Sequence, residues 1–143
     1  MKVNEFMSKN VISVAPDTSI IEIARIMKNN NIGSVPVVKE SKVIGIVTDR
    51  DIVLRDIAEG KDIKKVTAKD VMTTGVTTAT PEMDIHEAAK IMSEKQVRRL
   101  PVVEKNNQIV GMLALGDIAV YSKLEDDAGE ALSDISKPTN TMY

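Results

Sequence analysis

Residues 7–27 read MSKNVISVAPDTSIIEIARIM, and residues 72–92 read MTTGVTTATPEMDIHEAAKIM. When the chain is slid along itself so that Met7 falls on Met72, the same residue types recur along the whole segment. The matched residues of the first copy are Met7, Val11, Pro16, Ile20, Glu22, Ala24, Ile26 and Met27. Self-similarity at a fixed period indicates one supersecondary unit that the chain uses twice.

The match continues beyond these two segments. VPVV at 35–38 falls on LPVV at 100–103. After one inserted residue, Gly45, Asp51 and Ile52 fall on Gly111, Asp117 and Ile118. The repeat therefore extends over most of the chain and sets its domain organisation.

The repeat divides the chain into four parts. We predict a first repeat at 1–60, a linker at 61–68 and a second repeat at 69–122. The remaining tail, 123–143, is acidic at first and then polar. We expect part of the tail to be helical, around 128–135, and its end to be frayed.

The first half of each unit predicts a strand followed by a helix. A short apolar segment, 11–15 or 76–80, precedes a proline and then a helix start. Two residue pairs have the capping-box spacing, Ser19 with Glu22 and Asp84 with Glu87. The helices that follow carry one apolar stripe each, formed by Ile20, Ile23, Ala24 and Met27 and by Ile85, Ala88, Ala89 and Met92.

The second half of each unit predicts a hairpin and another helix. The β-branched runs, separated by polar turns, are SVPVV with KVIGIVT and LPVV with QIVGML. The closing helix of the first unit begins near Asp49 and ends at Gly60, and its counterpart begins near Asp117. We thus predict an α+β fold with two β-α-β-β-α repeats, packed sheet to sheet in a pseudo-two-fold arrangement.

Composition excludes several classes of function. The 143 residues have a net charge of −2, one Phe, two Tyr and no Trp, so a nucleic-acid partner is not expected. The chain has no cysteine, which excludes disulfides and thiolate chemistry. The sequence shows neither a long apolar run nor a targeting segment, so we expect no membrane association and a cytoplasmic location.

The remaining chemistry-bearing residues do not form a catalytic set. His86 is the single histidine and stands in the first turn of a predicted helix, where we expect it to be exposed or half-buried. Met27 and Met92 are core residues by periodicity. Gly45 and Gly111 stand alone in predicted strands, where they allow a close backbone approach. No nucleophile with a base, metal-ligand set or carboxylate pair is evident, so we predict that the protein is not an enzyme.

The sharpest difference between the repeats lies in GIVTDRDIV (45–53) and GMLALGDIA (111–119). Thr48 and Asp51 have the spacing of a capping box, so they form a helix start, a ligand site or both. The second copy keeps the carboxylate as Asp117, but Ala114 lacks the hydroxyl.

The residues quoted above make the chain resemble a tandem cystathionine-β-synthase (CBS) domain pair, or Bateman module, of the stand-alone type. The resemblance covers about residues 3–121. It implies a regulatory homodimer with clefts between the repeats that bind AMP, ADP, ATP or S-adenosylmethionine. Such a protein would act as an energy or stress sensor toward an unknown downstream protein, and it would require no cofactor.

The resemblance also implies roles for individual residues. The Asp51 carboxylate would accept hydrogen bonds from the ribose hydroxyls, and the Thr48 hydroxyl, beside the helix-start amides, would suit a phosphate. The adenine slot of the first copy would be lined by Ile12, Ser13, Val35 and Pro36. The matching residues of the second copy are Asp117, Thr77, Thr78, Leu100 and Pro101.

Two arginines distinguish the second copy. Arg98 and Arg99 stand directly before LPVV, where the first copy has the uncharged pair Gly33 and Ser34. A guanidinium binds phosphate with two parallel hydrogen bonds, so we expect these arginines to meet the phosphate charge. The cationic side chains of Arg25, Lys28, Arg50 and Arg55 are expected to be solvated or to contact a second subunit.

Two hypotheses follow from the sequence. In the first, an adenine nucleotide binds in two unequal clefts, with Asp51 in the better one. In the alternative, the protein is a ligand-free interaction or stress-response module that dimerises, and Thr48 and Asp51 only cap a helix.

Overall fold

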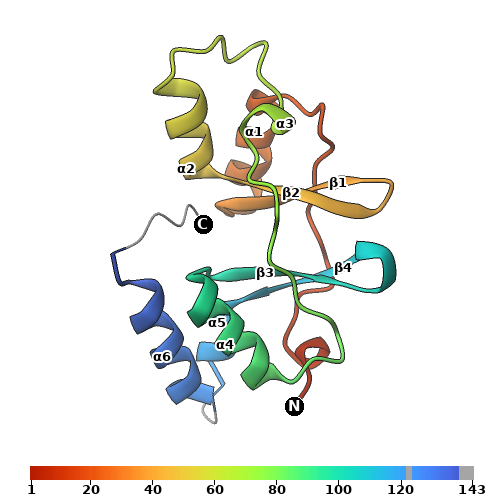
Figure 1. The fold of residues 1–143 in the computed structure, drawn as a ribbon. Coiled ribbons are helices and arrows are strands. Elements are labelled where there is room, and N and C mark those ends of the chain that lie inside the picture. The colour runs from red at the N-terminus through yellow and green to blue at the C-terminus, as the bar shows by residue number, and fades with distance from the viewer. Residues whose placement is uncertain (122–123, 139–143) are drawn as a thin grey trace. The chain divides into compact units, whose positions relative to one another are not determined.

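The structure is a computed structural model that describes residues 1–121 and 124–138 (Figure 1). The chain forms two packing units, residues 12–76 and residues 1–11 with 77 onward. The helices of the described ranges are α1 (Ile20–Asn30), α2 (Asp49–Ile52), α3 (Ala68–Val71), α4 (Ile85–Lys95), α5 (Leu115–Ala119) and α6 (Glu125–Ile135). The strands are β1 (Ser34–Lys39), β2 (Lys42–Thr48), β3 (Arg99–Val103) and β4 (Ile109–Ala114). Short helical turns occur at Val3–Glu5, Val53–Ile57 and Lys105–Asn107.

The unit of residues 12–76 is built on the antiparallel hairpin β1–β2, in which Ser34 lies opposite Thr48. Its turn passes through Glu40 and Ser41, whose φ angles of 53° and 66° lie in the left-handed region that two-residue hairpin turns require. The core beneath one face of the hairpin is aliphatic and includes Ile20, Ile23, Val35, Val37, Val47, Ile52, Val66 and Val71.

Helix α1 has the predicted start. The Ser19 hydroxyl accepts a hydrogen bond from the Glu22 amide at 3.2 Å, and the helix ends at Asn31 in the left-handed region. Three of the four predicted stripe residues are buried, whereas Ala24 is exposed. In α4 the whole stripe is buried, but the cap differs from the prediction because Asp84 accepts from the His86 amide.

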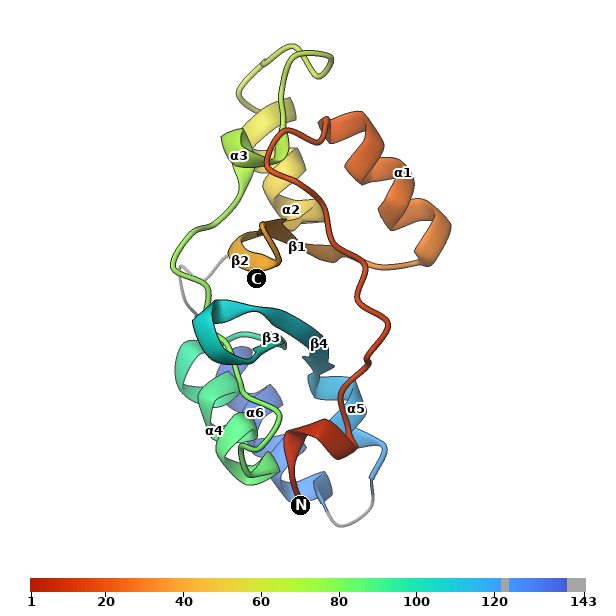
Figure 2. The same cartoon turned by 90° about the vertical axis from the view of Figure 1, so that its right-hand side faces the viewer.

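The second unit repeats this plan around β3–β4 and adds α6, which lies beside α4 and α5 (Figure 1 and Figure 2). Leu124, Ala128 and Ala131 bury the inner face of α6 in the core of this unit. The tail helix is therefore longer than the predicted turn at 128–135. The predicted fraying falls on residues 139–143, which lie outside the described residues.

Polar contacts fasten α6 to α4. His86 Nδ1 lies 2.7 Å from Asp127 Oδ2, and Gln96 donates to the Asp134 carbonyl at 2.9 Å. The Ser93 hydroxyl donates to the Asp134 carboxylate. His86 is exposed, as predicted, and its role is a contact between two helices.

The leading segment of each repeat packs on the hairpin of the other repeat. Met72 covers Gly45 of β2, and Met7 covers Gly111 of β4. Backbone bridges join Ile46 to Thr73 and Ser8 to Met112 in the same way. We call this reciprocal packing of leading segments the exchange. Because of it, residues 1–11 belong to the unit of the second repeat, and residues up to 76 belong to the unit of the first repeat.

The packing units are thus divided differently from the predicted segments. The predicted linker at 61–68 contains the buried residues Val66 and Ala68. The predicted strands at 11–15 and 76–80 are reduced to single parallel bridges, Val14 to Val37 and Ala79 to Val102. Both segments run into a proline, which has no amide hydrogen with which to extend a ladder.

The helices that follow each hairpin also depart from the prediction. α2 begins at Asp49 and continues as a π-helical turn, so the helical backbone ends at Ile57. Gly60 follows with a φ of 67°. α5 begins at Leu115, and Asp117 is therefore its third residue.

In the ranges 1–121 and 124–138, no helix has both the length and the apolar character that a bilayer crossing requires.

Gly111 is predicted to be a stability determinant. A Cβ at this position would lie 2.6 Å from Met7 Sδ and 3.0 Å from the Ser8 carbonyl oxygen. Gly111→Ala should therefore lower the free energy of unfolding by about 1–3 kcal/mol, measured by chemical denaturation. Gly129→Ala on α6 is the control, because a Cβ there meets nothing within 4 Å and should be neutral or stabilising. Equal stability of Gly111→Ala and wild type would contradict the close packing.

Candidate functional site

A reciprocal capping box closes the end of β2 onto α2. The Thr48 hydroxyl accepts from the Asp51 amide at 3.0 Å, and Asp51 Oδ2 accepts from the Thr48 amide at 2.9 Å. Both side chains are buried, Thr48 to 6% exposure and Asp51 to 0%. The spacing in the sequence predicted this geometry, because a helix start needs side-chain partners for its unpaired amides.

The first amides of α2 are all used within the chain. Asp49 donates to the Gly33 carbonyl at 2.9 Å, Arg50 donates to Asp49 Oδ1 at 2.8 Å, and the Asp51 amide donates to Thr48. The expectation that a phosphate would lie beside Thr48 and these amides stays a prediction.

Asp51 has one carboxylate oxygen without a hydrogen-bond partner. Oδ2 is held by the Thr48 amide, whereas Oδ1 is buried and accepts no hydrogen bond. The nearest cation is Arg55, whose Nε lies 3.7 Å from Oδ1. Burial raises the pKa of the Asp51 carboxyl, and the Thr48 backbone hydrogen bond and the Arg55 charge oppose that rise.

Arg55 is a structural part of the site, not a solvated surface charge. Its Nη1 donates to the carbonyls of Val71 and Met72, at 3.0 and 3.2 Å. The arginine thereby links α2 to the leading segment of the second repeat. Its spacing of four residues from Asp51 was the available signal in the sequence, since such residues meet on one helix face.

Ser34 was not predicted as a site residue. It lies opposite Thr48 in the hairpin, and its hydroxyl is buried without a hydrogen-bond partner. The buried hydroxyl of Thr73, which follows the carbonyls that hold Arg55, is also unpartnered. No pattern in the sequence indicates this burial, because it depends on which face of the hairpin is covered.

The corresponding element of the second repeat is more open. Ala114 offers no hydroxyl, so only Asp117 Oδ2 makes a capping bond, at 2.9 Å from the Ala114 amide. The Leu115 amide donates to the Arg98 carbonyl at 2.8 Å.

Arg98, directly before β3, and Arg99, the first residue of β3, are available to a partner. Arg98 is exposed and Arg99 half-buried. Within the described ranges neither guanidinium makes an ion pair or a side-chain hydrogen bond. Their role in binding phosphate remains a prediction.

The residues expected to line an adenine slot are divided between the faces of each hairpin. The side chains of Val35 and Leu100 are 0% exposed within the cores of their units, and their place in an adenine slot stays a prediction. Alternation along a strand places Pro36 and Pro101 on the opposite faces, where both are buried. Of the remaining candidates, Ser13 is exposed, and Ile12, Thr77 and Thr78 are half-buried.

The predicted site residues divide between the two packing units, as two groups. Thr48, Asp51, Val35, Pro36, Ile12 and Ser13 belong to the unit of residues 12–76. The other unit holds Asp117, Thr77, Thr78, Arg98, Arg99, Leu100 and Pro101.

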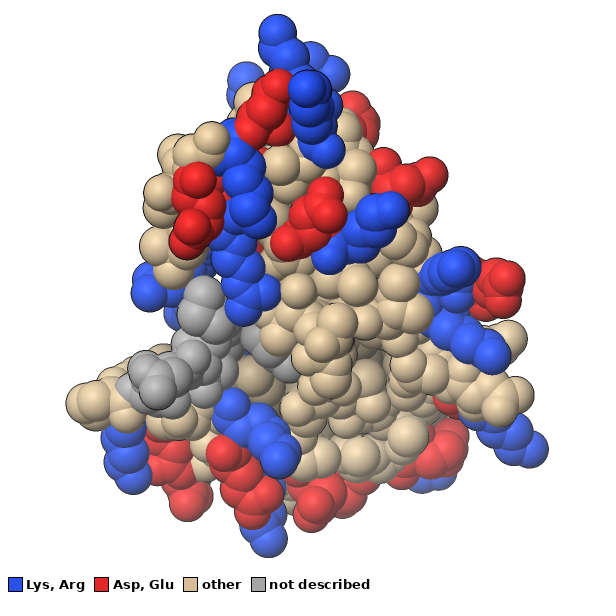
Figure 3. Space-filling view, turned by 45° about the horizontal axis from the view of Figure 1, so that its top comes forward, with Lys and Arg blue, Asp and Glu red and all other residues tan. Residues whose placement is uncertain are grey.

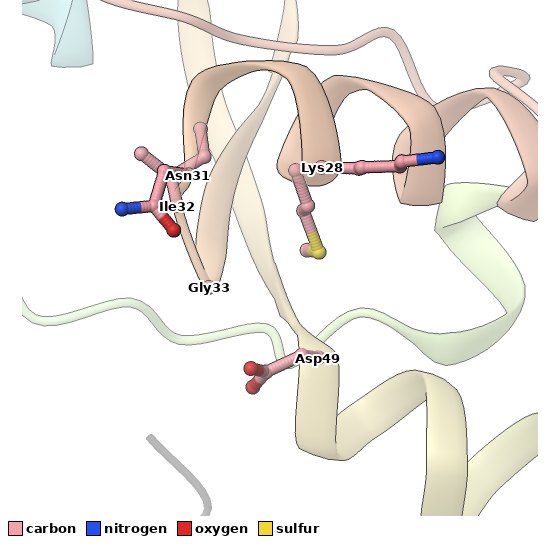
Figure 4. A pocket seen from close by; sticks show the side chains of 6 residues that line it. Lys28, Asn31, Ile32, Gly33 and Asp49 are labelled. Carbon is pink, nitrogen blue, oxygen red and sulfur yellow. The ribbon is translucent and has the colours of Figure 1, made fainter.

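A depression of about 460 Å³ opens beside the first group (Figure 4). It is lined by Met27, Lys28, Asn31, Ile32, Gly33 and Asp49. A Cβ on Gly33 would lie 3.0 Å from Asp49 Oδ2, so the carboxylate lies directly against the glycine backbone. Figure 4 shows the amine of Lys28 pointing away from Asp49, which leaves this carboxylate without the lysine as a partner.

The face shown in Figure 3 has no continuous basic patch among the residues that the structure describes. On the face shown in Figure 3, lysines and arginines are interspersed with aspartates and glutamates. In the ranges 1–121 and 124–138, no three His, Asp or Glu side chains are grouped in a way that could hold a metal ion.

The capping box predicts opposite effects for one pair of substitutions. Thr48→Ala removes the acceptor of the Asp51 amide and should lower the free energy of unfolding by about 1 kcal/mol. Ala114→Thr supplies the missing hydroxyl of the second element and should raise it by a similar amount. Urea denaturation of both variants checks this. No change in either would show that the hydroxyl is not a helix cap.

Asp51 predicts a pH-dependent difference in stability. Because its pKa in the folded protein is raised above the usual value of an aspartate, the folded state keeps a proton that the unfolded chain has lost. The contribution of Asp51 to stability therefore falls as the pH rises through the interval between the two pKa values. Asp51→Asn keeps an acceptor for the Thr48 amide but does not titrate. Its free energy of unfolding, relative to wild type, should increase from about pH 4 to pH 7; a decrease would contradict the raised pKa.

Comparison with known proteins identifies the repeat. The family model of the CBS domain matches residues 3–57 and 68–123. The CBS domain-containing protein YhcV of Bacillus subtilis is 41% identical over 134 residues, which cover 94% of each chain.

Two solved structures have the same fold. The CBS domain pair of protein MJ0100, in complex with 5′-methylthioadenosine and S-adenosyl-L-methionine, is 32% identical with a TM-score of 0.75, over 83% of this chain and 93% of that one. Protein MJ1225 of Methanocaldococcus jannaschii, a proposed archaeal homologue of g-AMPK, is 26% identical with a TM-score of 0.73, over 81% of this chain and 45% of that one. The two matched segments and these likenesses show that the chain belongs to the CBS domain family, as a tandem pair.

Proposed function

We propose that the protein is a non-enzymatic regulator that binds an adenine nucleotide or a related adenosyl ligand and signals through a change of shape. The observation that carries this proposal is the pair of buried, unpartnered atoms beside Thr48, namely Ser34 Oγ and Asp51 Oδ1. A buried polar group without a partner costs about 1–3 kcal/mol, so these atoms favour a ligand that supplies hydrogen bonds.

A ribose has the matching chemistry. Its vicinal hydroxyls are donors, and Asp51 Oδ1, which is ion-paired with Arg55 but accepts no hydrogen bond, is an acceptor beside the capping box. The apolar side chains on either hairpin provide the hydrophobic surroundings that an adenine ring needs. The complex of MJ0100 with two adenosyl ligands supports this class of ligand.

A homodimer is part of the proposal. Val53 and Ile57 are 51% and 58% exposed and lie four residues apart, on one outer face of the helical segment after β2. Two exposed aliphatic side chains in this spacing favour packing against a helix of a second copy. The downstream protein partner and the cytoplasmic location remain predictions.

The second candidate function is a ligand-free interaction module. The completeness of the first capping box favours it, because every amide at the start of α2 is paired without a ligand. In that case Thr48 and Asp51 serve stability alone.

A thermal-shift panel separates the two candidates. A ligand that binds only the folded state adds RT ln(1 + [L]/Kd), about 2.7 kcal/mol at one hundred times Kd, which shifts Tm on the order of 10 °C. We expect such a shift with at least one of AMP, ADP, ATP, S-adenosylmethionine, 5′-methylthioadenosine and NAD. Asp51→Asn combined with Asp117→Asn should abolish it. If none of these compounds shifts Tm at millimolar concentration, the nucleotide-binding proposal is contradicted and the ligand-free interaction module is supported.

A further inference from the structure

The second repeat has a helix that the first repeat lacks. α6 follows α5, packs against α4 and α5, and buries Leu124, Ala128 and Ala131 in the core of its unit (Figure 1). In the first repeat, residues 58–67 follow the corresponding helical segment and form turns without a helix. Within the unit of residues 12–76, the face of α1 and α2 that corresponds to the binding face of α6 therefore lacks this cover.

Burial differs between matched residues in the way that the missing helix predicts. Ala89 of α4 and Leu115 of α5 are 3% and 8% exposed, and both belong to the core cluster that contains the inner face of α6. Their counterparts in the first repeat, Ala24 and Asp49, are exposed. Ala24, the stripe residue of α1 that is not buried, thus lies on a face that is covered in the other repeat.

The depression shown in Figure 4 corresponds to the place where the end of α6 binds in the second unit. There, the Ser93 hydroxyl donates to the Asp134 carboxylate, and Gln96 donates to the Asp134 carbonyl at 2.9 Å. The residues at these two positions of the first repeat are Lys28 and Asn31, which are exposed and line the depression of about 460 Å³. The depression is therefore the open counterpart of a binding site for the last turn of a helix.

Charge distinguishes this face from its counterpart. Lys28 stands where the second repeat has the neutral Ser93, and within the described ranges its ammonium makes no ion pair. Figure 4 shows this ammonium pointing away from Asp49, so it can pair with an incoming carboxylate without bringing that carboxylate against Asp49. A cation at the end of a docked helix is also favoured by the negative end of the helix dipole.

The last turn of a docked helix would find a second donor on this face. The final carbonyls of a helix have no partner within the helix, and Gln96 donates to one of them at the end of α6. The side-chain amide of Asn31 can donate in the same way. The face thus combines donors for a carboxylate and for a helix end with the small apolar side chain of Ala24.

We propose that this face binds an amphipathic helix of a partner protein. We call the face the α1 groove and define it by Ala24, Lys28, Asn31 and the depression that they border. The partner helix has small apolar residues on its inner side and a carboxylate in its last turn, as α6 has in Ala128, Ala131 and Asp134. This inference goes beyond the proposed function, because the α1 groove needs no adenosyl ligand.

A labelled peptide with the sequence of residues 124–137, with alanine in place of Gly129 to favour the helix, is the probe. Fluorescence anisotropy should show saturable binding to the full chain. Free peptide at micromolar concentration should not displace the tethered α6, whose effective concentration is higher. Lys28→Glu should weaken binding about tenfold, because an attraction becomes a repulsion. Lys42→Glu, at the far end of the β1–β2 hairpin, carries the same change in charge and should leave binding unchanged.

A charge exchange tests the contact directly. A second peptide with Asp134→Lys should bind wild type about tenfold more weakly and should recover its affinity on the Lys28→Glu chain. Ala24→Gln places a longer side chain on the groove and should weaken both peptides. Because Ala24 and Lys28 are exposed, the unliganded variants should be as stable as wild type in urea denaturation.

Three results would overturn the proposal. The first is a lack of saturable binding of the peptide to wild type, and the second is equal binding by wild type, Lys28→Glu and Ala24→Gln. The third is a wild-type dimer that Lys28→Glu dissociates while the peptide does not bind, which would assign the α1 groove to a second copy of the chain. None of these results bears on adenosyl binding, because the assay contains no nucleotide.

Discussion

The rest of the structure depends on two glycines, because their lack of a side chain allows another segment to pack on each hairpin. At Gly45 and Gly111 the backbone of each hairpin is open to a methionine that comes from the start of the other repeat, Met72 in one case and Met7 in the other. A side chain at either glycine would meet the methionine sulfur and a backbone carbonyl, so the exchange depends on glycine. The exchange brings the carbonyls of Val71 and Met72 to Arg55, and Arg55 in turn lies beside Asp51. The position of Arg55 at the candidate site therefore depends on the exchange of leading segments.

Once duplicated, the unit has diverged at the start of one helix. The first copy has a closed capping box and buried hydroxyls, which make it rigid but leave Ser34 and Asp51 with unmet hydrogen-bonding capacity. The second copy gives up the cap at Ala114 and has Arg99 at the matching strand position. Loss of a cap costs about 1 kcal/mol, a small amount beside the hydrophobic core that supports each hairpin. Substitutions at one helix start, with a small cost in stability, thus give the two repeats chemically different helix starts.

Periodicity and spacing were sufficient to predict the repeat, both hairpins, the start of α1 at Ser19 and the Thr48–Asp51 box, because these depend on residues close in sequence. The exchange was not predictable, since nothing local indicates that Met7 packs on Gly111 instead of on its own repeat. The strand predicted at 11–15 failed because one bridge at Val14 is all that forms before Pro16. Arg55 and Ser34 were missed because their roles come from burial and from tertiary partners, which a solvated charge and a small polar residue do not reveal.

The exchanged leading segments also bear on how such a chain could arise. A single copy of the repeat would have its own methionine segment but no second hairpin to receive it, and its own glycine would stay uncovered. It could complete the packing only by trading segments with another molecule, so its folding would depend on protein concentration. Joining two copies in one polypeptide replaces that encounter with a tethered one, at an effective concentration that the connecting residues set. Duplication would thus replace an assembly that dilution dissociates with a single chain, in which the packing of the leading segments is independent of dilution.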